Sequence, residues 1–167
     1  KYLEKKNKNV SVYLQNNIGY GKAINYGSKF VKTKFFFVIN PDTKIFKNTL
    51  INLIIAGNKI RNFGAMSPQM YHKKNKKPKK MVRIEKNLDG GAMFFRTKIF
   101  KRLKGFDENI FLYYEDNDYF TKCRIRKIKL YTVMNSFFFH KKNGSSSATF
   151  KNSNEKKYAN LINAWHG

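Results

Sequence analysis

The stretch Phe35-Phe36-Phe37-Val38-Ile39-Asn40-Pro41-Asp42 decides the fold. Its first five residues form a continuous apolar run, which is typical of a strand buried on both faces. The polar triplet then ends this strand, because proline fixes its own backbone and lacks an amide hydrogen. In α/β sheets ligands bind beyond the carboxyl ends of strands, so we expect a site at Asn40-Pro41-Asp42.

The pattern on both sides of this run alternates between strands and helices. Apolar positions with helical spacing predict helices, and short apolar or alternating runs bounded by turn residues predict strands. This order favours an α/β fold with a mainly parallel central sheet flanked by helices. The predicted elements are strand 10–15, turn 16–19, helix 20–31, helix 49–63, strand 64–67, edge strand 82–84, buried strand 92–95, helix 97–103 stopped by Gly105, and strands 129–133 and 137–140.

The 167 residues predict a single domain with a packed core. Hydrophobic residues make up 41% and aromatic residues 16% of the chain, which is too much for a disordered basic tail. We predict a basic loop over 72–80, a flexible Gly/Ser-rich loop over 141–153 and the start of a C-terminal helix over 154–167. No apolar run approaches the roughly 18 residues that span a membrane. Cys123, the lone cysteine, suits a reducing compartment.

The chain has 35 Lys and Arg against 10 Asp and Glu, a formal net charge of +25. Such an excess usually points to an acidic partner: nucleic acid, an anionic membrane or a phosphorylated ligand. Codon composition is the competing explanation, because 89 of the 167 residues are Lys, Asn, Phe, Ile or Tyr, which A/T-rich codons encode. The basic residues are scattered and no nucleic-acid-binding motif accompanies them. The charge alone therefore does not identify DNA or RNA as the partner.

Six residues at four places in the chain could carry chemistry, and each place has a structural alternative. Asp42 could hold a divalent metal at the end of the buried strand, or it could cap a turn. Asp116, preceded by Glu115, could take a proton from an attacking hydroxyl, or both acids could simply favour a helix N-terminus. His140 could be a metal ligand or merely end a strand. Gly90-Gly91 could let the backbone approach a phosphate or sugar, or form a turn.

In their order along the chain, the motifs resemble those of the family 2 glycosyltransferases, and most closely the bacterial rhamnosyltransferase-like branch. The resemblance extends from about residue 10 to the end of the chain, and its specificity lies in the ordered set rather than in any one motif. The set is Asn17-x-Gly19, Asn25-x-Gly27, Asn40-Pro41-Asp42, Gly90-Gly91-Ala92, Gly105-Phe106-Asp107-Glu108, Phe111-Leu112-Tyr113-x-Glu115-Asp116-x-Asp118 and His140.

The resemblance implies a GT-A fold and inverting transfer of a sugar from a nucleotide diphosphate donor to an acceptor hydroxyl. Asp42 matches the last Asp of the family's DxD motif, and Asn40 stands in place of the first. His140 matches the histidine that completes the metal site, so Asp42 and His140 would hold Mg or Mn. Asn17 and Gly19 join Asn40 and Asp42 as the implied donor-binding residues.

The same resemblance assigns the acceptor side. Asp116 matches the catalytic base of the family's Glu/Asp-Asp motif, with Glu115 as its catalytic neighbour. Gly90 and Gly91 match the acceptor-side glycine pair. The implied donor sugar is rhamnose or another deoxyhexose, and the implied acceptor is a cell-surface glycan or a lipid-linked hydroxyl in polysaccharide biosynthesis.

The chain departs from the family pattern at its start, where a strand that grips the nucleotide base normally precedes the segment corresponding to residues 10–15. We therefore expect a partial GT-A domain over residues 1–167, incomplete at its N-terminus. The expected location is the cytoplasm, with peripheral contact at the inner face of the cell membrane through the basic surface. The competing classes are a non-catalytic basic module that binds nucleic acid or anionic membrane, and an inactive glycosyltransferase fragment.

Overall fold

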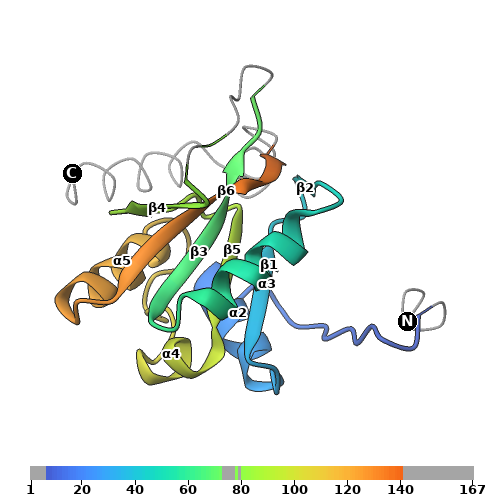
Figure 1. The fold of residues 1–167 in the computed structure, drawn as a ribbon. Coiled ribbons are helices and arrows are strands. Elements are labelled where there is room, and N and C mark those ends of the chain that lie inside the picture. The colour runs from blue at the N-terminus through green and yellow to red at the C-terminus, as the bar shows by residue number, and fades with distance from the viewer. Residues whose placement is uncertain (1–6, 73–77, 79, 141–167) are drawn as a thin grey trace.

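A computed structural model describes residues 7–72, 78 and 80–140, and in this part of the chain a six-stranded sheet carries helices on both faces (Figure 1). The predicted loop 141–153 and helix 154–167 lie outside the described residues, as does most of the basic loop 72–80. In chain order the elements are α2 (Tyr20–Lys29), β1 (Phe35–Ile39), β2 (Thr43–Ile45), α3 (Thr49–Lys59), β3 (Phe63–Met70), β4 (Val82–Glu85), β5 (Ala92–Arg96), α4 (Thr97–Arg102), α5 (Glu115–Ile125) and β6 (Lys129–His140).

The strands lie in the order β1-β5-β3-β6-β2, and β4 pairs with β6 off this path. Among these pairs only β3 and β6 run parallel, whereas β1–β5, β3–β5, β2–β6 and β4–β6 are antiparallel. The predicted α/β sheet with flanking helices is confirmed, but the mainly parallel strand direction is wrong. An apolar run predicts a buried strand without revealing the direction of its neighbours, because residues far apart in the sequence set that direction.

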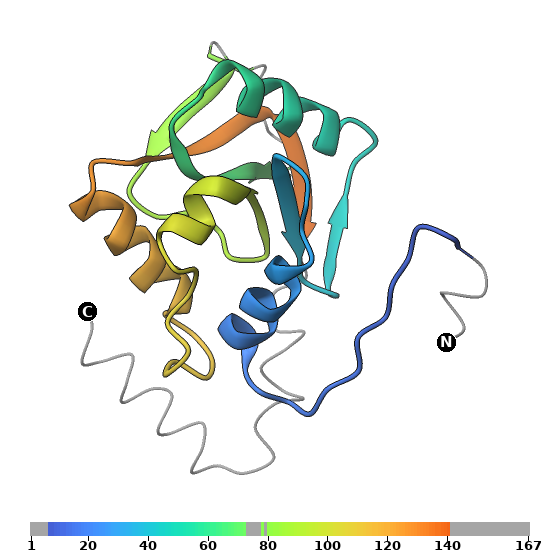
Figure 2. The ribbon, with the colours of Figure 1, turned by 90° about the horizontal axis from the view of Figure 1, so that it is seen from below.

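The core has two halves, one on each face of the sheet. Helix α3 covers one face, while α2, α4 and α5 lie on the other (Figure 2). Phe94 and Phe95 are neighbours on β5 and point to opposite faces, as alternate side chains of a strand do. Phe94 packs with Leu53 and Phe63, and Phe95 packs in the other half with Phe100. Strand β5 is therefore anchored on both faces.

Strand β1 is partly exposed, although its apolar run predicts burial on both faces. Four of its residues are half-buried and Ile39 is exposed. The reason is its place in the sheet, because β1 is the end strand of the order and pairs with β5 alone among the described strands. Its aromatic side chains pack across the pair, with the Phe36 and Phe95 ring centroids 5.0 Å apart.

The strand predicted over residues 10–15 does not form. Leu14 is 86% exposed, and the alternation there has no neighbouring strand among the described residues to cover it. Tyr13 instead stacks on Phe30 beyond the end of α2, with ring centroids 4.3 Å apart. An isolated strand of this length has no stability of its own, so the alternating pattern was not sufficient to predict a strand here.

Most of the remaining elements follow the predictions within a few residues, but no element was predicted where β2 and α5 form. Helix α3 ends at Lys59 rather than residue 63, because β3 already begins at Phe63. Gly105 stops the region of α4 with a left-handed φ of 64°. Asn25 of α2 is buried beside it, where its amide donates to the Phe106 carbonyl at 2.9 Å and accepts from the Phe106 N–H at 3.0 Å.

The strands predicted over 129–133 and 137–140 are one continuous strand, β6. Its register against β3 is interrupted, because Pro68 pairs with Val133 while the next residue, Gln69, pairs with Phe137. Residues 134–136 are thus skipped by β3. Beyond this irregularity β6 pairs with β2.

Within the described part of the chain, no helix has the length and apolar character needed to cross a bilayer.

Candidate functional site

A cavity of about 510 Å³ opens where the segment after β1, the loop before β5, the start of α5 and the end of β6 meet. Eight acids fall within the described residues, and three of them line this cavity, while a fourth, Asp42, contacts a lining residue. A strongly basic chain therefore concentrates its negative charge here. The lining residues are Tyr20, Asn40, Pro41, Asp89, Gly90, Gly91, Leu112, Tyr113, Tyr114, Glu115, Asp116, Asn117 and His140.

Asp42 and His140 are 98 residues apart in sequence and in contact in space. The β2–β6 ladder places Thr43 opposite His140, so the residue before Thr43 meets the histidine. Asp42 Oδ1 lies 3.1 Å from His140 Nε2, and both side chains are largely buried. On its other side, His140 Nδ1 lies 3.8 Å from Asp89 Oδ1. The histidine therefore stands between two carboxylates, one of which the sequence reasoning did not select.

Asp42 and His140 supply two donors to a divalent cation, not a complete cage. Among the described residues, no three His, Cys, Asp or Glu side chains cluster as metal ligands. Mg²⁺ and Mn²⁺ favour oxygen donors and complete their octahedral shell with water or substrate phosphates. Asp42 and His140 therefore fit a cation that takes its remaining ligands from a diphosphate.

Glu115 and Asp116 begin α5, and the backbone that delivers them is unusual. Tyr113 and Tyr114, directly before the helix, both have left-handed φ values of 65° and 72°. Non-glycine residues pay for this conformation, and such strain concentrates at functional sites. Asp116 Oδ1 accepts the Asn117 backbone N–H at 2.7 Å, which fixes one carboxylate oxygen.

Glu115 is buried, and Asp116 is half-buried in the wall of the cavity. Burial raises the pKa of Glu115 from 4.5 to about 7, and the nearby Asp116 charge adds to this rise. Burial also raises the pKa of Asp116, and Asp89 contributes through charge repulsion. Glu115 Oε2 is buried with no hydrogen-bond partner among the described residues. A raised pKa strengthens a carboxylate as a base, so Asp116 can accept a proton more readily than a solvated aspartate can.

We expect Glu115 to make the fold less stable as the pH rises. The folded chain binds this proton more tightly than the unfolded chain, so its favourable contribution is complete below pH 4.5 and is lost as the pH rises towards about 7. The Glu115→Gln variant should therefore gain stability relative to the wild type between pH 5 and pH 8. Urea denaturation of both proteins at pH 5 and at pH 8 measures their free energies of unfolding. The prediction would be contradicted if the difference between variant and wild type were the same at the two pH values.

Gly90 and Gly91 separate the two halves of the site. A Cβ atom on Gly90 would lie 2.8 Å from Asp116 Oδ2, and one on Gly91 would lie 2.9 Å from His140 Nδ1. Neither glycine has a left-handed φ, so their requirement is close packing rather than backbone freedom. Because neither glycine has a side chain, Asp116 can lie against Gly90 and His140 against Gly91. Gly91 also ties this segment to Asn40, whose N–H donates to the Gly91 carbonyl at 3.0 Å.

The Gly91→Ala variant should weaken metal binding by about tenfold while the chain stays folded, because the added methyl group displaces His140. Titration of Mn²⁺ followed by isothermal calorimetry measures the loss. Gly27→Ala is the matched control, since a Cβ there meets nothing within 4 Å and alanine favours the helix. Unchanged Mn²⁺ affinity in the Gly91 variant would contradict the role assigned to the glycine.

Tyr20 is a site residue that the sequence reasoning missed. Its hydroxyl lies 2.8 Å from Asn40 Oδ1 and 3.1 Å from the Gly90 carbonyl oxygen, and it can donate to either. Burial raises the pKa of this hydroxyl and the surrounding carboxylates add to the rise, so it remains a donor. Tyr20 therefore links the segment that holds Asp42 to the segment beside Asp116. The only sequence signal was its place directly after Gly19.

Asn17 and Gly19 do not line the cavity. Asn17 Oδ1 accepts the Gly19 N–H at 3.2 Å, which forms the turn that starts α2. Gly19 has φ 92°, and a Cβ there would strike the Phe111 carbonyl oxygen at 2.5 Å. Tyr20 N–H donates to that same oxygen at 3.0 Å. In this part of the chain the two residues dock α2 against the segment before α5, and their donor-binding role stays a prediction.

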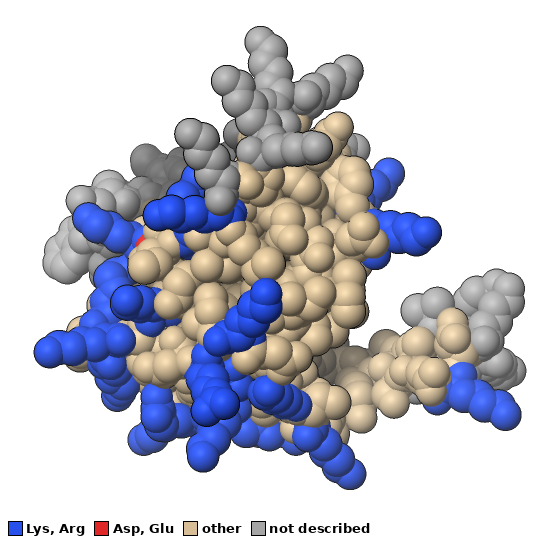
Figure 3. Space-filling view, viewed as in Figure 1, with Lys and Arg blue, Asp and Glu red and all other residues tan. Residues whose placement is uncertain are grey.

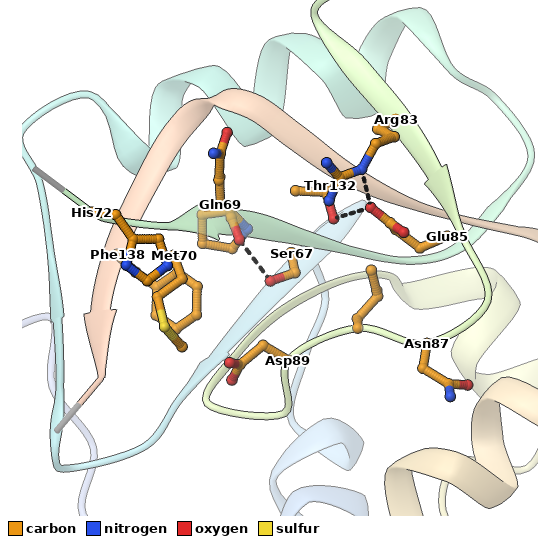
Figure 4. A pocket seen from close by; sticks show the side chains of 12 residues that line it. Ser67, Gln69, Met70, His72, Arg83, Glu85, Asn87, Asp89, Thr132 and Phe138 are labelled. Atoms are coloured by element: carbon orange, nitrogen blue, oxygen red, sulfur yellow. Dashed lines mark hydrogen bonds and ion pairs between the residues drawn. The ribbon is translucent and has the colours of Figure 1, made fainter. Parts of the chain in front are cut away.

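Asp89 also lines a second cavity, of about 330 Å³, between β3, β4 and β6 (Figure 4). Arg83 Nε donates to Glu85 Oε1 at 2.5 Å, and the Thr132 hydroxyl donates to the same oxygen at 3.1 Å. The charges of Arg83 and Glu85 offset each other, so Asp89 is the remaining carboxylate in the lining of this cavity. Phe138 contributes a buried apolar wall on the other side.

The sheet, its two helical layers and the position of the cavity define the GT-A fold of glycosyltransferases. The crystal structure of GalNAc-T7 with UDP, GalNAc and Mn²⁺ matches with a TM-score of 0.71 and 15% identity, over 83% of this chain and 34% of that chain. The S. aureus TarS 1–349 complex with UDP-GlcNAc matches with a TM-score of 0.66 and 18% identity, over 95% of this chain and 50% of TarS.

TarS 1–349 in a second crystal structure matches with a TM-score of 0.58 and 16% identity, over 81% of this chain and 46% of that chain. The chain therefore spans between a third and a half of the length of these structures. No protein-family model matches the chain, and no curated protein matches it in sequence. At these identities the comparisons establish the fold alone.

Proposed function

We propose that this chain belongs to a metal-dependent, inverting glycosyltransferase of the family 2 type, which transfers a sugar from a nucleoside diphosphate to an acceptor hydroxyl. One observation carries the proposal. Asp116 and the Asp42–His140 pair, which come from three separate parts of the sequence, meet around Gly90 and Gly91 at one cavity. The GT-A fold supports the transfer of a sugar, and UDP and Mn²⁺ in the GalNAc-T7 structure and UDP-GlcNAc in the TarS structure support a nucleotide-activated donor and a divalent metal.

The side chains divide the reaction between them. Asp42 and His140 would hold a divalent metal ion, which would neutralise the charge that grows on the departing diphosphate. Asp116 accepts the proton of the acceptor hydroxyl as that oxygen forms its bond to the anomeric carbon. The bond between this carbon and the donor phosphate breaks, and its electron pair leaves with the diphosphate. Attack from the face opposite the leaving group inverts the anomeric configuration.

Tyr20 and the glycine pair position these groups. The Tyr20 hydroxyl ties Asn40 to the Gly90 carbonyl, so the metal-binding segment and the segment beside Asp116 keep a fixed separation. Reacting atoms must be held close to their productive geometry, and rigid contacts of this kind supply that precision. Glu115 is buried beside Asp116 and is partly protonated near neutral pH. This partial protonation limits the repulsion between the two carboxyl groups.

The substrates are also part of the proposal. The ordered motifs favour a deoxyhexose donor such as rhamnose, and a cell-surface glycan or lipid-linked acceptor reached from the inner face of the cell membrane. The second cavity supports acceptor binding on the Asp89 side, because it shares this residue with the first cavity and presents polar side chains opposite an apolar wall.

A panel of nucleotide sugars tests this function. The chain is incubated with dTDP-rhamnose, UDP-GlcNAc or UDP-GalNAc and Mn²⁺ or Mg²⁺, and release of the nucleoside diphosphate is measured with and without EDTA. Metal-dependent release from one donor is expected, together with an inverted anomeric signal in the NMR spectrum of the product. Absence of both donor binding and release across the panel, in a folded chain, would contradict the proposal.

A further inference from the structure

Helix α3 exposes apolar side chains on the side that faces away from the sheet. Its buried face includes Leu53 and Ala56, which pack in the core half on that side. Ile51 and Ile55 lie one turn apart on the outer side, and they are 51% and 40% exposed. Leu50, beside Ile51, is exposed as well. The helix thus presents aliphatic side chains both to the core and to its surroundings.

Two aromatic residues extend this apolar surface beyond the start of α3. Phe46 N–H donates to the Thr49 hydroxyl at 2.9 Å, which holds Phe46 against the first turn of the helix. The Tyr71 ring packs on the Phe46 ring, with centroids 4.9 Å apart, and both side chains are exposed. We call the combined surface the α3 patch. It consists of Phe46, Leu50, Ile51, Ile55 and Tyr71.

The charge around the α3 patch has one sign. The described stretch 43–72, which contains α3, has three Lys and one Arg and no Asp or Glu, although Asp42 directly precedes it. Lys44 and Lys47 flank the start of α3, and Lys59 ends it. On the face that carries α3, Lys and Arg side chains surround much of the uncharged area, and acidic side chains are almost absent from view (Figure 3). An apolar surface with a purely basic rim complements an anionic bilayer.

We propose that the α3 patch is a docking surface for an anionic lipid bilayer. Ile51, Ile55 and Phe46 enter the boundary between headgroups and acyl chains, while the flanking lysines contact lipid phosphates. A second copy of the chain fits poorly, because a symmetric contact would set lysine against lysine with no acid from this stretch to offset them. Nucleic acid would use the lysines but gain nothing from exposed isoleucines.

This inference rests on the membrane location in the proposed function and names the surface that makes the contact, while the vesicle experiments below test it separately from sugar transfer. It also bears on the candidate site, since Phe46 follows Asp42 by four residues and so lies within about 14 Å of it along even an extended chain. Docking through the α3 patch would therefore hold the cavity close to the membrane surface.

Vesicle flotation tests the surface directly. The chain is mixed with vesicles of pure phosphatidylcholine, or with vesicles that contain phosphatidylglycerol, at low and at physiological salt. We expect binding to the anionic vesicles that weakens with salt, and at least tenfold weaker binding to phosphatidylcholine. The double variant Ile51→Ser/Ile55→Ser should lower the anionic partition coefficient about tenfold, and Lys47→Gln/Lys59→Gln should lower it by a similar factor.

Ile125→Ser is the matched control, because Ile125 is 74% exposed on α5, on the opposite face of the sheet. It should bind vesicles as the wild type does. Equal binding by the wild type and the Ile51/Ile55 variant would overturn the proposal, since charge alone would then account for attachment. Failure to bind vesicles, or α3 variants that abolish dimer formation or DNA binding instead, would also overturn it.

Ile51→Trp, made together with Trp165→Phe so that the introduced tryptophan is the chain's sole one, gives a second readout that does not depend on loss of binding. Its fluorescence emission should shift to the blue when phosphatidylglycerol vesicles are added, whereas Ile125→Trp in the same background should show no such shift. An unshifted Ile51→Trp spectrum under conditions where the chain floats with vesicles would show that another face docks and would overturn the proposal.

Discussion

The Asp116→Asn variant is expected to lower sugar transfer about a thousandfold while the fold and donor binding persist. The amide cannot accept the proton of the acceptor hydroxyl, yet its oxygen can still accept the Asn117 N–H that fixes the aspartate. The loss should therefore appear in kcat rather than in donor affinity. Product formation from the active donor, with donor binding followed by calorimetry, separates the two quantities.

Asp118→Asn is the control on the same helix. Asp118 pairs with Lys122 at 2.7 Å, one turn along α5, and does not line the cavity. Its substitution should change transfer by no more than about twofold, because surface ion pairs of this kind contribute little. If Asp116→Asn retained the wild-type rate, or if both variants lost activity equally, Asp116 could not be the base.

Asp42→Ala should abolish the metal-dependent part of donor binding, a loss of about a hundredfold or more in affinity. Asp42 supplies the carboxylate nearest to His140, and the described residues offer no cluster of three ligands that could compensate. His140→Ala should act in the same direction. Titration of the nucleotide sugar with Mn²⁺ and again with EDTA measures the metal-dependent component.

Lys44→Ala is the matched control for this second prediction. Lys44 lies two residues from Asp42 on β2 and is exposed, so its loss removes a general attraction for phosphates without touching the Asp42–His140 pair. Metal-dependent binding should persist in this variant. Retention of that binding in Asp42→Ala would mean that the metal, if used, is held elsewhere.

Local patterns predicted the elements better than they predicted the pairing between them. Helix α2, strand β5 and Gly105 were all apparent from spacing and residue type, because each depends on its own few residues. The burial predicted for β1 and the strand predicted over 10–15 were wrong, because both depend on whether a neighbouring strand is present. Strand direction likewise follows from contacts between distant residues.

The candidate site also contains residues that local patterns predicted and residues that they did not. Asp42, Asp116 and His140 stood out because polar residues ending apolar runs are conspicuous, and the structure brings all three to one region. Tyr20 and Asp89 did not stand out, since their importance comes from packing against Asn40, Gly90 and His140 and not from any pattern around them. Gly90-Gly91 was selected for approach to a ligand, but the structure adds a second reason, its close packing against two side chains.

The skipped residues 134–136 of β6 imply a rule about chain length. Successive side chains of a strand alternate between faces, so the number of residues in this segment sets which face His140 occupies. Removing or adding a single residue there would turn the imidazole away from Asp42, although no ligand had been substituted. The length of this segment is therefore constrained, and so is the identity of Ser136, which is buried and whose hydroxyl donates to the Thr49 carbonyl oxygen at 2.9 Å.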